Sequence, residues 1–272
     1  MARINRHRLS SQKPVLSRFS LTDRVALVTG ACGQLGRQFV QALAEAGARV
    51  VLCDIAKRPV LALAKHYAEV YRSPMLGLSM DVTRPVSIEA GLRQVKRWAG
   101  SLDILVNNAG MGLFTPWESR TEKEANRIID LNIKGVLWCT KIFSRFMRQC
   151  RRGSIINIGS IYGLVSADPR IYGKSGRNSA ELYAATKGGV IQMTRYMAVH
   201  LAPYNIRVNS ITPGGVFQHQ EKAFVKKYAD KTPLHRMAQE DELNGAVVFL
   251  ASEASSYVTG HNLVVDGGFT AW

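Results

Sequence analysis

Short apolar runs alternate along the chain with longer segments in which apolar residues recur at helical spacing. The short runs are rich in Val, Ile and Leu, which is typical of strands that are covered on both faces. They predict seven strands, at Val25–Thr29, Arg49–Cys53, Met75–Ser79, Ile104–Val106, Ser154–Ile158, Arg207–Ile211 and Leu263–Val265. The longer segments predict six helices, over Leu35–Ala46, Val60–Tyr71, Val86–Trp98, Glu122–Cys150, Ala180–Leu201 and Glu240–Ala251. Because strands and helices alternate, we expect an α/β fold in which a doubly wound parallel sheet of about seven strands carries helices on both faces.

The chain shows no internal repeat and no Pro/Gly-rich linker, and its 272 residues suit one domain. Residues 21–272 are therefore expected to form that single domain. The first twenty residues contain five basic residues, no acidic residue and no apolar periodicity, which predicts a disordered basic arm. The least regular stretches, Ile161–Leu182 and Gly214–Pro233, follow predicted strands and so belong at the edge where open α/β sheets bind ligands.

Basic residues outnumber acidic ones, with 36 Lys and Arg against 20 Asp and Glu, so the formal net charge is +16. Such a charge favours solubility and attracts anionic small molecules. The excess is spread along the chain without an aromatic-interleaved basic stripe, so we expect no nucleic-acid partner. No apolar run reaches the about 18 residues of a membrane span, so we expect no membrane partner and a cytoplasmic location. The four cysteines and six histidines lack the spacing of disulfide frameworks or metal sites, which predicts reduced thiols and no metal.

A glycine-rich turn joins the first predicted strand to the first predicted helix. Its glycines, Gly30, Gly33 and Gly36, allow a tight turn and a close approach of the backbone to a pyrophosphate. The helix then directs its free N–H groups toward the phosphates. Asp54 follows the next strand, close to the spacing expected for the acid that bonds the adenosine ribose. The pattern predicts a Rossmann-like dinucleotide site, although glycines and strand-end acids also occur in ordinary turns.

Over Leu21–Trp272 the sequence resembles the short-chain dehydrogenase/reductase family. The segments that carry the resemblance are TGACGQLG (29–36), NNAG (107–110), YAATK (183–187), ITPGG (211–215) and VTGHNLVVDGG (258–268), with Asp81-Val82, Asn132 and Ser160 between them. The resemblance implies a homotetramer or homodimer. It also implies that Asp81 and Val82 flank the adenine and that Pro213 and Gly214 hold the nicotinamide end. The cofactor-binding residues that it implies are Gly30, Gly33, Gln34, Leu35, Gly36, Asp54, Asp81, Val82, Asn108, Ala109, Gly110, Tyr183, Lys187, Pro213, Gly214 and Val216.

Tyr183 and Lys187 are four residues apart, which puts both side chains on one face of a helix. A lysine ammonium ~4 Å from the phenol would lower the pKa of Tyr183 by up to roughly three units, and an oxidised nicotinamide acts in the same direction. Tyr183 is therefore the expected catalytic acid/base, whereas an isolated Tyr-x-x-x-Lys pattern could equally be helix packing. Ser160 is expected to hold the substrate oxygen beside it. By the family resemblance, Asn132 anchors a water that links Lys187 to solvent.

These residues together predict an NAD-dependent oxidoreductase that interconverts a secondary alcohol and a ketone on a polar, sugar-like substrate, with an anionic substrate as one option. A carboxylate at Asp54 would repel the 2′-phosphate of NADP, so NAD is favoured. Lys57 and Arg58 lie nearby in the sequence and leave NADP open.

Two other functions stay open at this point. The spacing Gly30-x-x-Gly33-x-x-Gly36 resembles the longer, nucleotide-sugar-modifying branch of the family. The closing stretch, residues 257–272, resembles members linked to flagellin-glycan and nonulosonate sugar pathways. Both favour a nucleotide-sugar dehydratase or epimerase that retains NAD. A non-catalytic NAD(H)-binding sensor is the third function, which the set of Asn132, Ser160, Tyr183 and Lys187 disfavours.

Between Ser160 and Tyr183 the chain is about ten residues longer than the family usually needs. Since both ends must meet at one substrate oxygen, we predict that Ile161–Leu182 loops out as a substrate-covering lid. Arg170, Lys174 and Arg177 could then contact an anionic substrate. A solvated surface insertion or an oligomer contact is the alternative.

Overall fold

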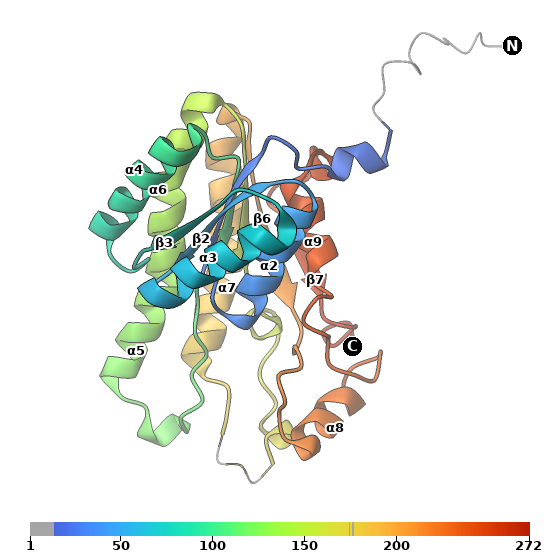
Figure 1. The fold of residues 1–272 in the computed structure, drawn as a ribbon. Coiled ribbons are helices and arrows are strands. Elements are labelled where there is room, and N and C mark those ends of the chain that lie inside the picture. Colours follow the sequence, from blue (N-terminus) through green and yellow to red (C-terminus); the bar gives the residue numbers. More distant parts are fainter. Residues whose placement is uncertain (1–13, 174, 176) are drawn as a thin grey trace, which may run out of the picture.

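The computed structural model describes residues 14–173, 175 and 177–272 (Figure 1). Its centre is a parallel sheet of seven strands in the order β3-β2-β1-β4-β5-β6-β7. This confirms the doubly wound α/β fold that the alternating pattern predicts. Most of the basic arm, residues 1–13, lies outside the described residues, as do Lys174 and Gly176 of the predicted lid. The strands are β1 (Val25–Thr29), β2 (Arg49–Asp54), β3 (Met75–Ser79), β4 (Ile104–Asn107), β5 (Gly153–Ile158), β6 (Ile206–Pro213) and β7 (Asn262–Val265).

The order of the strands reverses between β1 and β4. The chain passes outward from β1 to β2 and β3, then returns to pair β4 with the other side of β1, so that Leu27 lies between Val51 and Leu105. Connections on the two sides of this point run in opposite directions, which leaves a crevice at the carboxyl ends of the strands. The candidate site lies at this crevice.

Two apolar cores cover the two faces of the sheet. Alternate residues of β1 point to opposite faces, so Ala26 and Val28 belong to one core and Val25 and Leu27 to the other. The first core includes residues of α2, α3 and α9, and the second includes residues of α4, α6 and α7. The helices are α2 (Gln34–Glu45), α3 (Lys57–Tyr71), α4 (Pro85–Ala99), α5 (Glu122–Ile129), α6 (Gly135–Cys150), α7 (Glu181–Leu201), α8 (Lys222–Asp230) and α9 (Asn244–Ala251).

Three predictions about helices are corrected. The helix expected over Glu122–Cys150 is interrupted, because a π-helical turn over Asp130–Lys134 separates α5 from α6. The helix expected from Glu240 begins at Asn244, after a turn. The stretch expected to be irregular, Gly214–Pro233, contains α8, whose buried Tyr228 accepts a hydrogen bond from the backbone of Gly215. In the described ranges, no helix is both long and apolar enough to cross a membrane.

The described end of the N-terminal arm has defined structure. Leu16–Phe19 form a 3₁₀ turn, and the ring of Phe19 lies 6.4 Å from that of Phe249 in α9. Phe19 therefore has an aromatic partner on the body of the protein, and the disorder of the arm as a whole stays a prediction.

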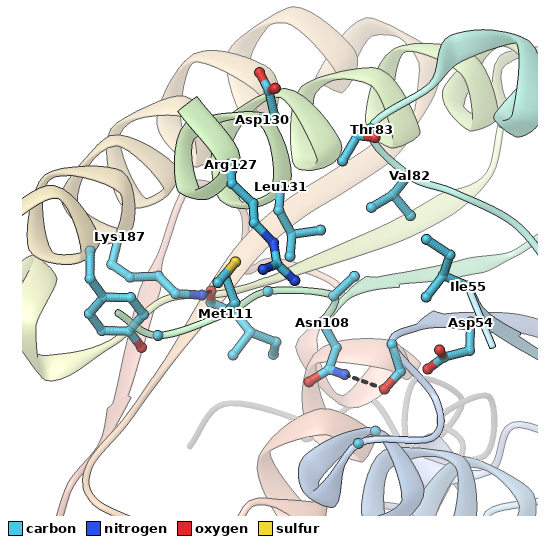
Figure 2. Close-up of a pocket in the computed structure, with 18 of the residues that line it drawn as sticks. Asp54, Ile55, Val82, Thr83, Asn108, Met111, Arg127, Asp130, Leu131 and Lys187 are labelled. Atoms are coloured by element: carbon cyan, nitrogen blue, oxygen red, sulfur yellow. Dashed lines mark hydrogen bonds between the residues drawn. The ribbon is translucent and has the colours of Figure 1, made fainter. Parts of the chain in front are cut away.

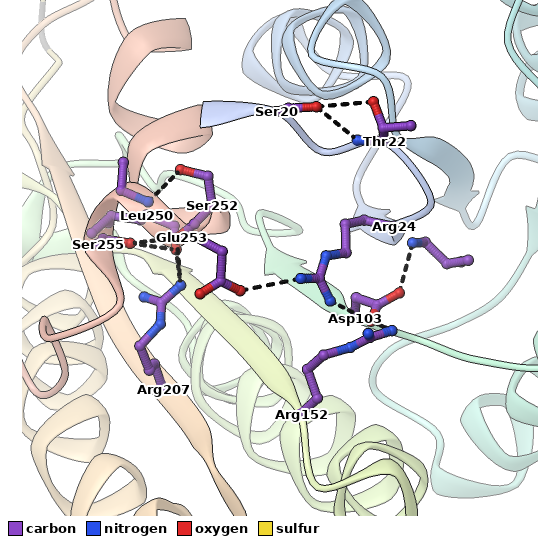
Figure 3. A network of polar contacts seen from close by, with 12 residues as sticks. Ser20, Thr22, Arg24, Asp103, Arg152, Arg207, Leu250, Ser252, Glu253 and Ser255 are labelled. Atoms are coloured by element: carbon purple, nitrogen blue, oxygen red, sulfur yellow. Dashed lines mark hydrogen bonds and ion pairs between the residues drawn. The ribbon is translucent and has the colours of Figure 1, made fainter. Parts of the chain in front are cut away.

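A network of charged side chains lies at the amino ends of the central strands (Figure 3). Asp103, which is buried, accepts a hydrogen bond from the backbone N–H of Val25 at 2.9 Å and pairs with Arg24 and Arg152. Arg24 also reaches Glu253 at 3.1 Å. The network joins the amino ends of the central strands to the segment after α9. Structural ion pairs therefore occupy this end of the sheet.

Candidate active site

A cavity of about 1080 Å³ lies at the carboxyl ends of the strands (Figure 2). It is bounded by the glycine-rich turn on one side and by α5 and the π-helical turn on the other. Fourteen of the predicted cofactor residues line it: Gly30, Gly33, Gln34, Leu35, Gly36, Asp54, Asp81, Val82, Asn108, Ala109, Gly110, Tyr183, Lys187 and Pro213. Gly214 and Val216 do not line it; they follow β6, where Gly214 donates to the carbonyl of Val265 and Val216 bridges to Ala238.

The glycine-rich turn fits a pyrophosphate. Gly30 has φ of +64°, and a Cβ there would lie 2.9 Å from the Cα of Ala109, so only glycine suits the position. A Cβ on Gly36 would overlap the carbonyl oxygen of Gly30. Gly33 is the N-cap of α2 and provides no side chain, so the first N–H groups of the helix face the cavity without a side-chain cap. A helix N-terminus of this kind favours an anion, which matches the predicted site for the phosphates of a dinucleotide.

Asp54 is held at the same end of the cavity by two backbone hydrogen bonds. Its carboxylate accepts from the N–H of Cys32 at 3.0 Å and from the N–H of Ala56 at 3.2 Å. Asn108 connects the end of β4 to this turn, since its amide donates to the carbonyls of Thr29 and Gly30 at 2.9 and 3.1 Å (Figure 2). These bonds fix the position of the carboxylate relative to the glycines.

Tyr183 lines the other end of the cavity, whereas Ser160 does not line it and directly follows the lining residues Ile158 and Gly159. Ser160 follows β5 and Tyr183 lies in the first turn of α7, and the side chain of Ser160 lies close enough to the phenol to influence its pKa. Burial raises the pKa of Tyr183 above its ordinary value, and the hydrogen bond with Ser160 acts in the opposite direction. Each of the two hydroxyls can donate and accept a hydrogen bond.

Lys187 differs from the prediction in where its ammonium group points. Its Nζ lies 5.8 Å from the centroid of the Tyr183 ring and donates to the carbonyl of Ile158 at 2.7 Å. Burial lowers the pKa of Lys187 to about 8. Burial is thus the largest influence on the pKa values of both groups, and the combined lowering of the Tyr183 pKa by Lys187 and an oxidised nicotinamide stays a prediction.

Asn132 joins three segments of the site from the π-helical turn. Its side chain accepts from the N–H of Met111 at 2.9 Å and donates to the carbonyl of Met111 at 3.0 Å and to the hydroxyl of Thr186 at 3.1 Å. A Cβ on Gly110 would lie 3.3 Å from Asn132 Oδ1 and 3.5 Å from Lys187 Nζ, so this glycine allows both side chains to approach the loop. The predicted role of Asn132 in holding a water stays a prediction.

The segment Ile161–Leu182 packs against α8. The hydroxyls of Tyr162 and Tyr172 lie 3.3 Å apart, and the ring of Tyr172 lies 5.4 Å from that of Phe224 in α8. Asp168 also forms an ion pair with Lys231, just after the same helix. The segment is therefore joined to α8 by aromatic contacts and by an ion pair.

The two described arginines of this segment have different surroundings. Arg170 is paired with Asp168 at 2.9 Å, so its guanidinium is already engaged. Arg177 lies over the ring of Phe114, at 4.4 Å, and Phe114 follows the cavity residues Met111 and Gly112. Of the two, Arg177 is the one placed beside the loop that leads into the cavity.

The cavity-lining residues that sequence reasoning missed include four from α5. Its cavity-lining residues include Lys123 and Arg127, and Leu131 follows in the π-helical turn. These three residues recur every four positions before Asn132, which is the spacing of one helical face. That periodicity was the feature of the sequence from which this cavity-lining face of α5 could have been predicted. In the part of the chain that the structure describes, no group of three or more His, Cys, Asp and Glu side chains could hold a metal ion.

Known proteins resemble this chain over almost its whole length. A family model described as enoyl-(acyl carrier protein) reductase matches residues 30–270. An NAD-dependent glycerol dehydrogenase of Listeria innocua serovar 6a is 33% identical over 257 residues, which cover 93% of this chain and 96% of that protein. The chain belongs to the short-chain dehydrogenase/reductase family.

Other members of the family extend the comparison. A 5-keto-D-gluconate 5-reductase of Escherichia coli K12 is 35% identical over 257 residues, with coverage of 92% of this chain and 96% of the relative. The crystal structure of a gluconate 5-dehydrogenase from Burkholderia cenocepacia J2315, in complex with NADP and tartrate, has a TM-score of 0.88 at 32% identity and covers 95% of this chain and all of that chain. The family resemblance is thus confirmed, and nicotinamide cofactors of both kinds occur among these short-chain dehydrogenase/reductase proteins. The suggested link to flagellin-glycan pathways stays a prediction.

Proposed function

We propose that this short-chain dehydrogenase/reductase uses NAD to interconvert a secondary alcohol and a ketone on a polar, sugar-like substrate. The observation that carries the proposal is that Tyr183 and Lys187 line the same cavity as a dinucleotide-type glycine turn, with Ser160 close enough to Tyr183 to influence its pKa. The names of the relatives, which act on glycerol and 5-keto-D-gluconate, support a polyol or sugar acid as the substrate class.

In this proposal each residue of the reacting end has a defined task. The nicotinamide supplies or accepts the hydride when the cofactor is bound. Ser160 holds the substrate oxygen, and Tyr183 Oη gives it a proton during ketone reduction or takes one during alcohol oxidation. Lys187 adds positive charge beside the phenol whenever it is protonated, which favours the tyrosinate needed for oxidation. Asn132 positions the loop at Gly110 and Met111 through its three hydrogen bonds.

The reaction itself provides the test. Purified protein is mixed with NAD⁺ and glycerol, gluconate or galactitol, and in the reverse direction with NADH and 5-keto-D-gluconate. The proposal expects NADH to accumulate with at least one alcohol and to be consumed with the ketone. Turnover of a nucleotide sugar without net NADH would instead support the epimerase or dehydratase alternative. Binding of NAD(H) without turnover of any of these compounds would support the sensor.

We predict that NADH binds at least about tenfold more tightly than NADPH, because the fixed carboxylate of Asp54 repels a 2′-phosphate. Titration of the protein with each reduced cofactor measures the ratio. Asp54→Asn should narrow it, whereas Asp23→Asn, a control at an exposed aspartate far from the cavity lining, should leave it unchanged. Tighter binding of NADPH to the wild-type protein would overturn the choice of NAD.

We predict that Arg177→Ala raises KM for an anionic sugar acid by about tenfold and leaves KM for glycerol unchanged, because Arg177 lies beside the loop that enters the cavity. Arg170→Ala is the matched control, since its guanidinium is engaged by Asp168. Steady-state kinetics with both substrates measure the difference. Equal changes in KM for the anionic sugar acid in Arg177→Ala and Arg170→Ala would contradict a substrate-covering role for this part of Ile161–Leu182.

We also propose a homo-oligomer in the cytoplasm. The outer face of α7 exposes Tyr196 and Val199, which are 71% and 78% exposed, and the C-terminal Trp272 is 78% exposed. Large apolar side chains on a surface favour burial against another subunit. The four cysteines are free thiols, which fits a reducing compartment.

A further inference from the structure

Arg127 extends from α5 into the cavity, on the wall opposite the glycine-rich turn (Figure 2). Figure 2 shows its guanidinium directed toward the region of Asn108, whose amide is bonded to the carbonyl of Gly30. The side chain is exposed, so it is free to adjust to a ligand in the cavity. Arg127 thus faces the part of the site that the uncapped end of α2 also faces.

The carboxylates nearest to Arg127 along its helix are engaged elsewhere. Asp130 pairs with Lys134 at 2.7 Å. Glu124 accepts hydrogen bonds from the backbone N–H and the hydroxyl of Thr121, both at 2.9 Å, as part of the capping box of α5. Within the described ranges Arg127 forms no ion pair.

Two carboxylates across the cavity are likewise occupied. Asp54 accepts from two backbone N–H groups, and Asp81 accepts from the N–H and the hydroxyl of Thr83 at 2.9 and 2.7 Å. Both carboxylates are therefore held by local donors, at the end of the cavity assigned to the adenosine. The guanidinium of Arg127 is left as a positive charge that faces the open cavity.

Lys123 precedes Arg127 by one helical turn and also lines the cavity. Like charges at this spacing repel each other, and the repulsion is relieved when an anion lies between or beside them. The glycine-rich turn has no basic side chain from residue 31 to residue 36, and the next, Arg37, donates to the carbonyl of Cys32 at 3.0 Å. Positive side chains for this part of the cavity therefore come from α5.

We propose that Arg127 binds the pyrophosphate of the dinucleotide, from the side opposite the N-terminus of α2. The two phosphates would then lie between the backbone N–H groups of α2 and a guanidinium that matches phosphate oxygens in a bidentate way. This inference rests on the proposed NAD-dependent function and adds to it a residue that no glycine motif contains. Arg127 acts in cofactor affinity and has no role in proton transfer.

Equilibrium binding tests the proposal without any substrate. Isothermal titration calorimetry with NAD⁺, NADP⁺ and ADP-ribose, and competition of adenosine against NADH, are carried out on the wild-type protein, Arg127→Gln and Arg127→Lys. Arg93→Gln, an exposed arginine of α4 that does not line the cavity, is the matched control for lost charge. Thermal unfolding of each variant confirms that it folds, as expected for substitutions of exposed side chains.

Arg127→Gln should raise Kd for NAD⁺ and ADP-ribose by about tenfold and leave adenosine binding unchanged, because adenosine has no phosphate. Arg127→Lys should recover part of the lost affinity for NAD⁺ and ADP-ribose. The affinity of the Gln variant should also depend less on ionic strength than that of the wild type.

Three results would overturn the proposal. Equal affinities of Arg127→Gln and Arg93→Gln for NAD⁺ would show that Arg127 does not contact the cofactor. A larger loss for NADP⁺ than for NAD⁺ would show that it contacts a 2′-phosphate and not the pyrophosphate. A wild-type protein that binds no nicotinamide dinucleotide would overturn the proposed function as well, whereas the first two results leave that function intact.

Discussion

Replacing Tyr183 by Phe is expected to lower kcat by about 10²–10⁴-fold while the affinity for NADH stays nearly unchanged. The substitution removes one hydroxyl, which is the group whose pKa Ser160 influences, and keeps the ring that lines the cavity. Initial rates of polyol oxidation and a fluorescence titration with NADH measure the two quantities. Tyr257→Phe is the control, because Tyr257 is fully exposed and does not line the cavity.

Activity above about a tenth of the wild-type value in Tyr183→Phe would mean that another acid/base operates, since a positioned proton-transfer group usually contributes at least ~10²-fold.

The dependence of the wild-type rate on pH gives a second check on the role of Tyr183. Burial raises the pKa of Tyr183, so the phenol is protonated at neutral pH in the protein without cofactor. Alcohol oxidation requires the deprotonated form and should become faster as pH rises above 7. Ketone reduction uses the protonated form and should not gain from the same change.

Replacing Lys187 by Met is expected to abolish turnover and to change how protein stability depends on pH. Burial lowers the pKa of Lys187 from its ordinary value of 10.5 to about 8. Each pH unit between the folded and unfolded pKa values corresponds to about 1.4 kcal/mol, so protonation costs the folded state up to about 3 kcal/mol at pH 7. Lys187→Met removes this cost and so gains stability at pH 7. The variant also loses the hydrogen bond to the carbonyl of Ile158, which offsets about 1–3 kcal/mol of the gain.

The direction of the pH effect follows from proton binding. Below pH 8 both the folded and the unfolded wild-type chains carry a protonated Lys187, so its cost is fully present. Between about pH 8 and 10.5 the unfolded chain binds more protons than the folded one, so the wild type gains stability relative to Lys187→Met. We therefore expect the variant to be at least as stable as the wild type at pH 7 and less stable near pH 10.5.

Urea unfolding of the cofactor-free proteins at several pH values measures this difference. Lys226→Met, at an exposed lysine of α8, is the control and should show no comparable change between pH 8 and 10.5. A constant difference in the free energy of unfolding between wild type and Lys187→Met across this range would contradict the burial of a titrating ammonium group. Retained turnover in the variant would separately contradict the task proposed for Lys187.

Local sequence patterns determined the sheet and much of the candidate site. Buried strands covered on both faces read as continuous apolar runs, so each of the seven predicted strands overlaps an observed one and their ends differ by two residues at most. Glycines in a strand-to-helix turn and a tyrosine–lysine pair one helical turn apart are also local features. They located both ends of the cavity, since the carboxyl ends of parallel strands converge on one edge of the sheet.

Only the tertiary structure decided the features that depend on partners distant in the sequence. The π-helical turn accompanies the bonds of Asn132 to Met111, 21 residues away, and to Thr186, 54 residues away. The lowered pKa of Lys187 comes from burial, and its ammonium points to Ile158, 29 residues earlier. The exposure of Arg127 to the cavity depends on how α5 lies against the crevice. Apolar periodicity records which face of an element is buried, and it carries no information about which distant polar group a side chain will meet there.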